Sequence, residues 1–169
     1  MKIILCPNPF RDKGLKAAYQ AQRILSAAGA KTEYCFPFPV EKSNIGDIDP
    51  SIKIKEMKTE LPDADFLVCF GGDGTILHAA KDASSFGVPI VGVNMGSVGF
   101  MAELEQGELS DLTRLVSGEY TLENRMLLDV RVIREGRVIF RSTALNDAVI
   151  TKGAVALSLI HISEPTRPY

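Results

Sequence analysis

The chain has 169 residues, of which 46% are hydrophobic and 24% charged, and its formal net charge is −2. This length fits one α/β domain, or one domain and part of another, and excludes a large multidomain assembly. The hydrophobic fraction is that of a folded protein rather than a disordered chain. Because 19 basic residues stand against 21 acidic ones, the sequence offers no basic excess for a nucleic-acid partner.

The cysteines and histidines are few and dispersed. Cys6, Cys35 and Cys69 lie far apart, as do His78 and His161. No CxxC pair, HExxH helix or Cys/His cluster occurs, so neither a zinc site nor a disulfide scaffold is expected. Dispersed thiols suit a reducing compartment, and no apolar run approaches the ~20 residues of a membrane span. We therefore expect a cytoplasmic protein that has no membrane partner.

The first part of the chain has the pattern of a β-α-β unit. Residues 3–6 form a short apolar run that ends at Pro7-Asn8-Pro9, which is typical of a buried parallel strand. Apolar residues then recur at helical spacing over 15–25 and stop before Gly29. The elements expected next are a strand over 31–36, a surface loop over 36–49 and a short exposed helix over 51–59.

Strands and helices continue to alternate in the middle of the chain. The expected elements are a strand over 65–70, a helix over 76–83, a strand over 88–93, a loop over 94–100 and a helix over 109–116. This alternation predicts an α/β fold, in which a mostly parallel sheet carries helices on both faces. Ligands then bind at the carboxyl ends of the strands.

The hydrophobic period changes from 3.6 to 2 near Tyr120, and apolar and polar residues alternate around a glycine turn at 134–137. We therefore expect an α/β domain over 1–120, followed over 121–156 by the start of an antiparallel β domain. The final string over 157–169, LSLIHISEPTRPY, does not continue this pattern. It resembles a translated adapter or vector read-through, so it is set aside from the fold.

The strongest motif is the loop Gly71-Gly72-Asp73-Gly74-Thr75, which follows a predicted strand and precedes a predicted helix. Glycines let backbone N–H groups approach a phosphate, and the start of the helix adds partial positive charge. The motif lacks the Gly-Lys-Ser/Thr ending of a Walker loop and the third glycine of a dinucleotide fingerprint. Both common nucleotide motifs are therefore excluded.

Asp73 is the candidate catalytic residue. A carboxylate beside a phosphate costs repulsion unless it accepts a hydroxyl proton or holds a divalent metal. The alternative is an aspartate that only caps the helix beginning near Thr75. Local sequence favours neither.

Four segments, FGGDGTILHAAK, VGVNMGSVGFM, ENRMLLDVRV and ALNDAVI, occur in this order. Together they resemble the NAD kinase family over residues 1–156. The resemblance implies the N-terminal fold of NAD and diacylglycerol kinases, and phosphorylation of the adenosine ribose 2′-hydroxyl of NAD to make NADP. A lipid or sugar kinase that shares only the GGDGT loop is the alternative enzyme, and the second and fourth segments speak against it.

The resemblance also assigns roles to individual residues. Asp73 matches the catalytic base, which accepts the 2′-hydroxyl proton, and it lies with Gly74 beside the bound NAD. Further NAD contacts are implied for His78, Phe100, Asn146 and Asp147, and the phosphate loop comprises Gly71, Gly72, Gly74 and Thr75. Structural alternatives stay open: an exposed helix position for His78, a core position for Phe100, and ordinary polar residues at the end of a strand for Asn146-Asp147.

Cofactors and partners follow from the resemblance alone. It implies NAD as substrate, ATP or polyphosphate as phosphoryl donor and Mg²⁺ or another divalent cation, with no metal ligand assigned. A homodimer or homotetramer is implied for the full-length protein. Because NAD kinases continue well beyond the Asn-Asp pair, we expect a chain truncated at its C-terminus. A non-catalytic nucleotide-binding fragment is therefore the third hypothesis.

Overall fold

The structure is a computed structural model that describes residues 1–41, 48–96, 99–145, 147–150 and 160–161. Contacts divide the chain into two units, Met1–Leu122 and Glu123–Tyr169. Each unit is described by itself.

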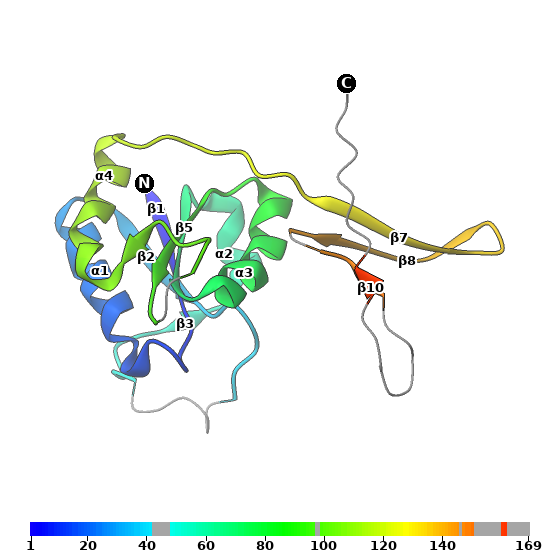
Figure 1. Ribbon diagram of the computed structural model, residues 1–169. Coiled ribbons are helices and arrows are strands. Elements are labelled where there is room, and N and C mark those ends of the chain that lie inside the picture. Colours follow the sequence, from blue (N-terminus) through cyan, green and yellow to red (C-terminus); the bar gives the residue numbers. More distant parts are fainter. Residues whose placement is uncertain (42–47, 97–98, 146, 151–159, 162–169) are drawn as a thin grey trace. The chain divides into compact units, whose positions relative to one another are not determined.

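A parallel sheet forms the centre of the first unit. Its strand order is β3-β2-β1-β4-β5-β6 (Figure 1). The strands are β1 (Lys2–Pro7), β2 (Lys31–Cys35), β3 (Ile54–Lys55), β4 (Phe66–Gly71), β5 (Ile90–Asn94) and β6 (Leu104–Glu105). Every neighbouring pair runs parallel, so the predicted α/β fold is confirmed. The order reverses between β1 and β4, and in such sheets this switch point opens a crevice for ligands.

Helices cover both faces of the sheet. The helical segments are η1 (Lys13–Leu15), α1 (Lys16–Ala27), α2 (Met57–Glu60), η3 (Leu61–Asp63), α3 (Asp73–Phe86), η4 (Gln106–Leu112) and α4 (Thr113–Ser117). A hydrophobic core lies on each face of the sheet, and alternate residues of β1 belong to one or the other. Ile3 and Leu5 pack with α1, η4 and α4, whereas Ile4 and Cys6 pack with α2, η3 and α3. Among the described residues, no helix is long and apolar enough to cross a bilayer.

Two helix predictions need correction. The short helix expected over 51–59 is wrong in part, because Ile54 and Lys55 form the edge strand β3 and only α2 is helical. A strand of two exposed residues carries no alternating pattern that could reveal it. The segment expected to be a helix over 109–116 is helical but is not one regular helix, because 109–112 belong to the 3₁₀ segment η4 and 113–116 to the short helix α4.

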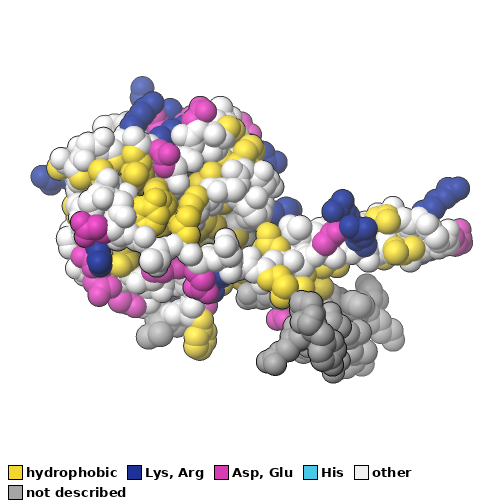
Figure 2. Space-filling view, turned by 90° about the horizontal axis from the view of Figure 1, so that it is seen from above, with side chains coloured by type: hydrophobic (Ala, Val, Ile, Leu, Met, Phe, Trp, Pro, Cys, Tyr) yellow, Lys and Arg dark blue, Asp and Glu magenta, His cyan; other side chains and the backbone are white. Residues whose placement is uncertain are grey.

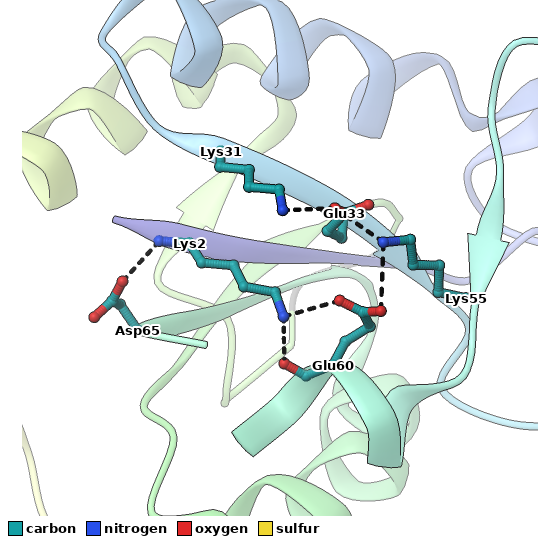
Figure 3. Close-up of polar contacts among 6 residues, drawn as sticks. All are labelled: Lys2, Lys31, Glu33, Lys55, Glu60 and Asp65. Carbon is teal, nitrogen blue, oxygen red and sulfur yellow. Dashed lines mark hydrogen bonds and ion pairs between the residues drawn. The ribbon is translucent and has the colours of Figure 1, made fainter. Parts of the chain in front are cut away.

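Opposite charges join β1, β2, β3 and α2 (Figure 3). Lys2 Nζ lies 2.8 Å from a Glu60 carboxylate oxygen, and Lys55 Nζ lies 3.4 Å from Glu60 and 3.0 Å from Glu33. The Lys2 backbone N–H donates to Asp65. The hydrogen bond from Lys2 is the largest of the effects that lower the pKa of Glu60. This network ties α2 and β3 to β1 and β2.

The cysteines are core residues. Cys6, Cys35 and Cys69 are free thiols and fully buried, as the sequence predicts. Burial is the main reason why the pKa of the Cys6 thiol is raised and that of Cys35 reaches about 12. Because the thiolate is the reactive form, Cys6 and Cys35 are packing residues rather than reactive thiols at neutral pH.

The second unit contains the predicted antiparallel hairpin. Strands β7 (Leu128–Arg134) and β8 (Arg137–Ala144) pair around Glu135-Gly136, which both have positive φ. Figure 2 shows hydrophobic side chains on the hairpin surface beside those of Lys or Arg. A short pair, β9 (Val149–Ile150) with β10 (Ile160–His161), follows. The strand β10 falls within the stretch 157–169, whose other residues lie outside the described part of the chain.

Candidate functional site

The glycine loop lies at the switch point between β1 and β4. Strand β4 ends at Gly71, extended Gly72 follows, and α3 begins at Asp73. The Gly71 carbonyl accepts the Met95 N–H at 3.0 Å, which attaches the loop after β5. Within the ranges that the structure describes, no atom other than those of the chain neighbours and of the α3 backbone itself lies within 4 Å of the position that a Cβ would take at Gly72 or Gly74. The backbone here is therefore open to a phosphate at the start of α3.

The Asp73 carboxylate points to the loop after β5 rather than to its own helix. Its two oxygens accept the N–H groups of Phe100 and Met101, each at 3.2 Å. Asp73 is the first residue of α3, and no side chain caps that helix by a hydrogen bond. The helix-capping alternative is therefore wrong. Since a carboxylate can accept about four hydrogen bonds, both oxygens keep capacity for a substrate hydroxyl.

Gly99 allows this carboxylate to come close, a role that no motif in the sequence indicated. A Cβ at Gly99 would lie 2.5 Å from Asp73 Oδ1. Any larger residue would push the carboxylate away from its two donors. The signal in the sequence is the glycine directly before Phe100, but nothing local shows which side chain comes near it.

Asn8 joins the end of β1 to the glycine loop. Its side-chain NH₂ donates to Thr75 Oγ1 at 3.0 Å, and its Oδ1 accepts the Phe10 N–H at 3.0 Å. The Asn8 backbone N–H donates to the Phe70 carbonyl at 2.9 Å. Thr75 is buried under this contact. Asn8 therefore shapes the turn after β1 and also contacts the glycine loop.

A side chain already fills the start of α1. Asp12 is 2% exposed, and its carboxylate accepts the N–H groups of Ala17 and Ala18 at 2.9 and 3.0 Å. Burial raises the pKa of Asp12, and hydrogen bonds from these N–H groups oppose the rise. The N–H groups that would otherwise attract a phosphate are therefore occupied. At this end of the sheet, α3 rather than α1 offers the anion site.

The structure describes three of the four other predicted NAD-binding residues, His78, Phe100 and Asp147. His78 is exposed in α3, with its ring 5.5 Å from that of Phe38. Phe100 is 95% exposed, so the core alternative for this residue is wrong. Asp147 is exposed in the second unit, and Asn146 lies outside the described residues. The structure therefore brings Asp73 together with Gly71–Thr75 and the Phe100 backbone, and their NAD-binding roles stay predictions.

The site suits a metal that phosphates help to hold. No group of three His, Cys, Asp or Glu side chains able to bind a metal occurs among the residues that the structure describes. Magnesium is commonly bound by one or two carboxylates together with substrate phosphates. The Asp73 carboxylate beside an anion-binding loop fits this mode.

The chain is similar in sequence to a known family of proteins. Residues 3–120 match the family described as the ATP-NAD kinase N-terminal domain. The NAD kinase of Acetivibrio thermocellus is 31% identical over 163 residues, which are 96% of this chain and 54% of the relative. The NAD kinase of Heliobacterium modesticaldum is 44% identical over 99 residues, 58% of this chain and 35% of the relative. The chain thus spans about half the length of the Acetivibrio relative, and its match to the Heliobacterium relative covers 35% of that protein.

A solved structure shares the fold. Yeast NADH kinase, crystallised in complex with NADH, superimposes with a TM-score of 0.70 over 92% of this chain and 49% of the yeast chain. The sequences are 18% identical, so this likeness concerns the fold alone.

Proposed function

The chain belongs to the NAD kinase family, and on this basis we propose that it forms the phosphate-handling part of an enzyme that phosphorylates NAD. The acceptor is the 2′-hydroxyl of the adenosine ribose, and the product is NADP. One observation carries the proposal: the Asp73 carboxylate lies between an open glycine loop and two backbone donors at the switch point. A base beside a phosphate site is what phosphoryl transfer to a hydroxyl requires.

In the proposed reaction Asp73 orients the 2′-hydroxyl and accepts its proton as the oxygen bonds to the terminal phosphorus of the donor. The phosphorus–oxygen bond to the rest of the donor breaks, and ADP, or a polyphosphate one unit shorter, leaves with that electron pair. The N–H groups of Phe100 and Met101 hold the carboxylate in place, so that little reorganisation accompanies the attack. Backbone N–H groups at Gly72 and Gly74 stabilise the charge on the transferring phosphoryl group. A bound divalent cation supplies further charge neutralisation on the donor's phosphates.

The finer assignments belong to the same proposal. ATP or polyphosphate is the donor, Mg²⁺ or another divalent cation assists, and His78, Phe100, Asn146 and Asp147 contact NAD. Family membership supports these assignments, together with a homodimeric or homotetrameric assembly of the whole protein. The free, buried thiols are compatible with a cytoplasmic location.

Turnover of the correct acceptor tests the proposal. Residues 1–156 are joined to the part of the Acetivibrio thermocellus NAD kinase that follows the segment matched to them, giving what we call the completed chain. The completed chain and the unmodified 169-residue chain are each incubated with Mg²⁺, a phosphoryl donor (ATP or polyphosphate) and an acceptor (NAD or diacylglycerol). We expect NADP from the completed chain and no phosphorylated lipid.

Other results distinguish the alternatives. Phosphorylated diacylglycerol without NADP would show a lipid kinase that shares only the glycine loop. Calorimetric binding of NAD without turnover in the completed chain would support a non-catalytic nucleotide-binding protein. Either result would overturn the proposed function.

A further inference from the structure

Phe10, Phe38 and His78 lie close together near the glycine loop. The proposed phosphoryl transfer gives the two phenylalanines no role and uses His78 only as a contact to NAD. The rings of Phe10 and Phe38 are nearly parallel, with centroids 6.2 Å apart and 10° between their planes. Phe38 meets His78 edge-on, at 5.5 Å and 68°. The three residues come from the loop after β1, the segment after β2 and helix α3. We call them the ring cluster.

The ring cluster lies at the surface rather than in either core. Phe10 is 52% exposed, His78 is exposed and Phe38 is half-buried. Neither hydrophobic core includes Phe10 or Phe38. An exposed phenylalanine that is held by a second ring presents a preorganised apolar surface, against which another flat ring can stack.

Hydrogen bonds connect the ring cluster to the phosphate loop. The Phe10 N–H donates to Asn8 Oδ1, and the Asn8 side chain donates to Thr75 Oγ1, each at 3.0 Å. The strands β2, β1 and β4 are neighbours in the sheet, so the segments that follow them lie at the same edge. A ligand with its phosphates at the glycine loop can therefore place an attached ring on this cluster.

The residue after Phe10 adds a positive charge near the same edge. Arg11 is exposed, and its Nη1 would lie 3.8 Å from a Cβ at Gly96. Within the described part of the chain, Arg11 forms no ion pair with a carboxylate. A guanidinium in this position can pair with a phosphate oxygen. One loop thus supplies both a ring and a cation.

We propose that the ring cluster is a stacking site for the adenine base of a nucleotide whose phosphates lie at the glycine loop. The inference rests on the proposed function for the nature of the ligand and goes beyond it by locating the base. NAD and ATP both carry adenine, and the stacking chemistry is the same for both. If the base belongs to ATP, the ring cluster favours ATP over a polyphosphate donor, which has no base; if it belongs to NAD, the ring cluster contributes to binding of the acceptor.

Isothermal titration calorimetry of ligands with the unmodified 169-residue chain tests the inference. The ligands are ATP, NAD and inorganic tripolyphosphate, each measured with Mg²⁺. The test variant is Phe10→Leu, which keeps the apolar volume and removes the ring. The control is Phe86→Leu, because Phe86 is 44% exposed at the other end of α3. Equal urea midpoints of the two variants establish that both are folded.

We expect Phe10→Leu to weaken binding of at least one adenine nucleotide by roughly five-fold or more, since base stacking commonly contributes this much. Tripolyphosphate and the Phe86→Leu variant should show no change. The nucleotide that weakens, ATP or NAD, identifies the source of the base. His78→Gln gives a second reading, with a smaller loss for the same nucleotide.

Three outcomes overturn the inference: no nucleotide binds the unmodified chain, Phe10→Leu binds both nucleotides normally, or the loss extends equally to tripolyphosphate. Failure here is distinct from failure of the proposed function. The latter is judged by turnover of the completed chain, which can make NADP even if the base lies elsewhere.

Discussion

Replacing Gly71 by alanine should destabilise the first unit, because the new methyl group has no room. A Cβ at Gly71 would lie 2.7 Å from Thr75 Cβ and 3.0 Å from Thr75 Cγ2. Thr75 is 3% exposed and its branched side chain has few rotamers, so it cannot step aside cheaply. Its hydroxyl also accepts the hydrogen bond from Asn8.

The magnitude follows from these two effects. Forcing an extra methyl group into a packed site costs about 1–3 kcal/mol, and loss of the Asn8–Thr75 hydrogen bond costs about 1 kcal/mol. The expected loss is therefore about 2–4 kcal/mol of unfolding free energy. With a urea slope of about 2 kcal/mol per molar, the midpoint should fall by roughly 1–2 M.

Gly72→Ala is the matched control, one residue along the chain. Its Cβ would have no neighbour within 4 Å, and its φ of −111° suits any residue. Alanine restricts the unfolded chain, which stabilises, but it is a poorer N-cap than glycine at the start of α3, which destabilises, so the net change should stay within about 1 kcal/mol. Urea unfolding followed by far-UV circular dichroism compares the two, because the signal comes mainly from helices of the first unit. Equal midpoints for both variants would refute the packing argument.

Three further predictions use other parts of the first unit. Gly99→Ala should displace the Asp73 carboxylate and lower kcat of the completed chain roughly ten-fold or more. The control Gly107→Ala, which has open space at its Cβ among the described residues, should leave kcat unchanged. Equal kcat values for the two variants would contradict the role of Gly99. Asp12→Ala should lower the unfolding free energy in urea by about 0.5–2 kcal/mol, because the hydrogen bonds from Ala17 and Ala18 are lost. The control Asp63→Ala, at an exposed position, should change it very little. An unchanged unfolding free energy for Asp12→Ala would show that these hydrogen bonds do not stabilise α1. The pKa of Glu60 is lowered from 4.5 in the fold, so its stabilisation is complete above 4.5 and is lost as the pH falls below it. Urea midpoints should therefore fall less between about pH 5.5 and pH 3 in Glu60→Gln than in the unmodified chain; the same fall in both would argue against this origin of the acid sensitivity.

Local pattern was sufficient for the parallel sheet and for the position of the glycine loop. The runs that became β1 and β4 are continuously apolar because both faces of the sheet are covered, and this pattern is visible in the sequence. The glycines at 71–74 mark the point where β4 passes into α3. Periodicity failed where an element is too short to show a period, as at β3 and α2.

The contacts that shape the site could not be predicted locally. Asp73 binds the backbone of residues in the loop after the next strand, and no spacing rule encodes that approach. Asp12 reaches α1 because Gly14 and Leu15 both adopt positive φ and turn the chain back. A buried leucine with φ of 53° is unusual, since this conformation is strained for residues other than glycine. The ring cluster likewise joins three segments that only the sheet order brings together.

The central claim is that Asp73 serves as the base in phosphoryl transfer to NAD. The most direct measurement is the rate of NADP formation by the completed chain carrying Asp73→Asn, beside Asp82→Asn from the same helix, with NAD binding measured in parallel. The account predicts a loss of at least about 100-fold for Asp73→Asn, NAD affinity nearly unchanged, and full activity for Asp82→Asn. Substantial NADP production by the Asp73→Asn variant would contradict it.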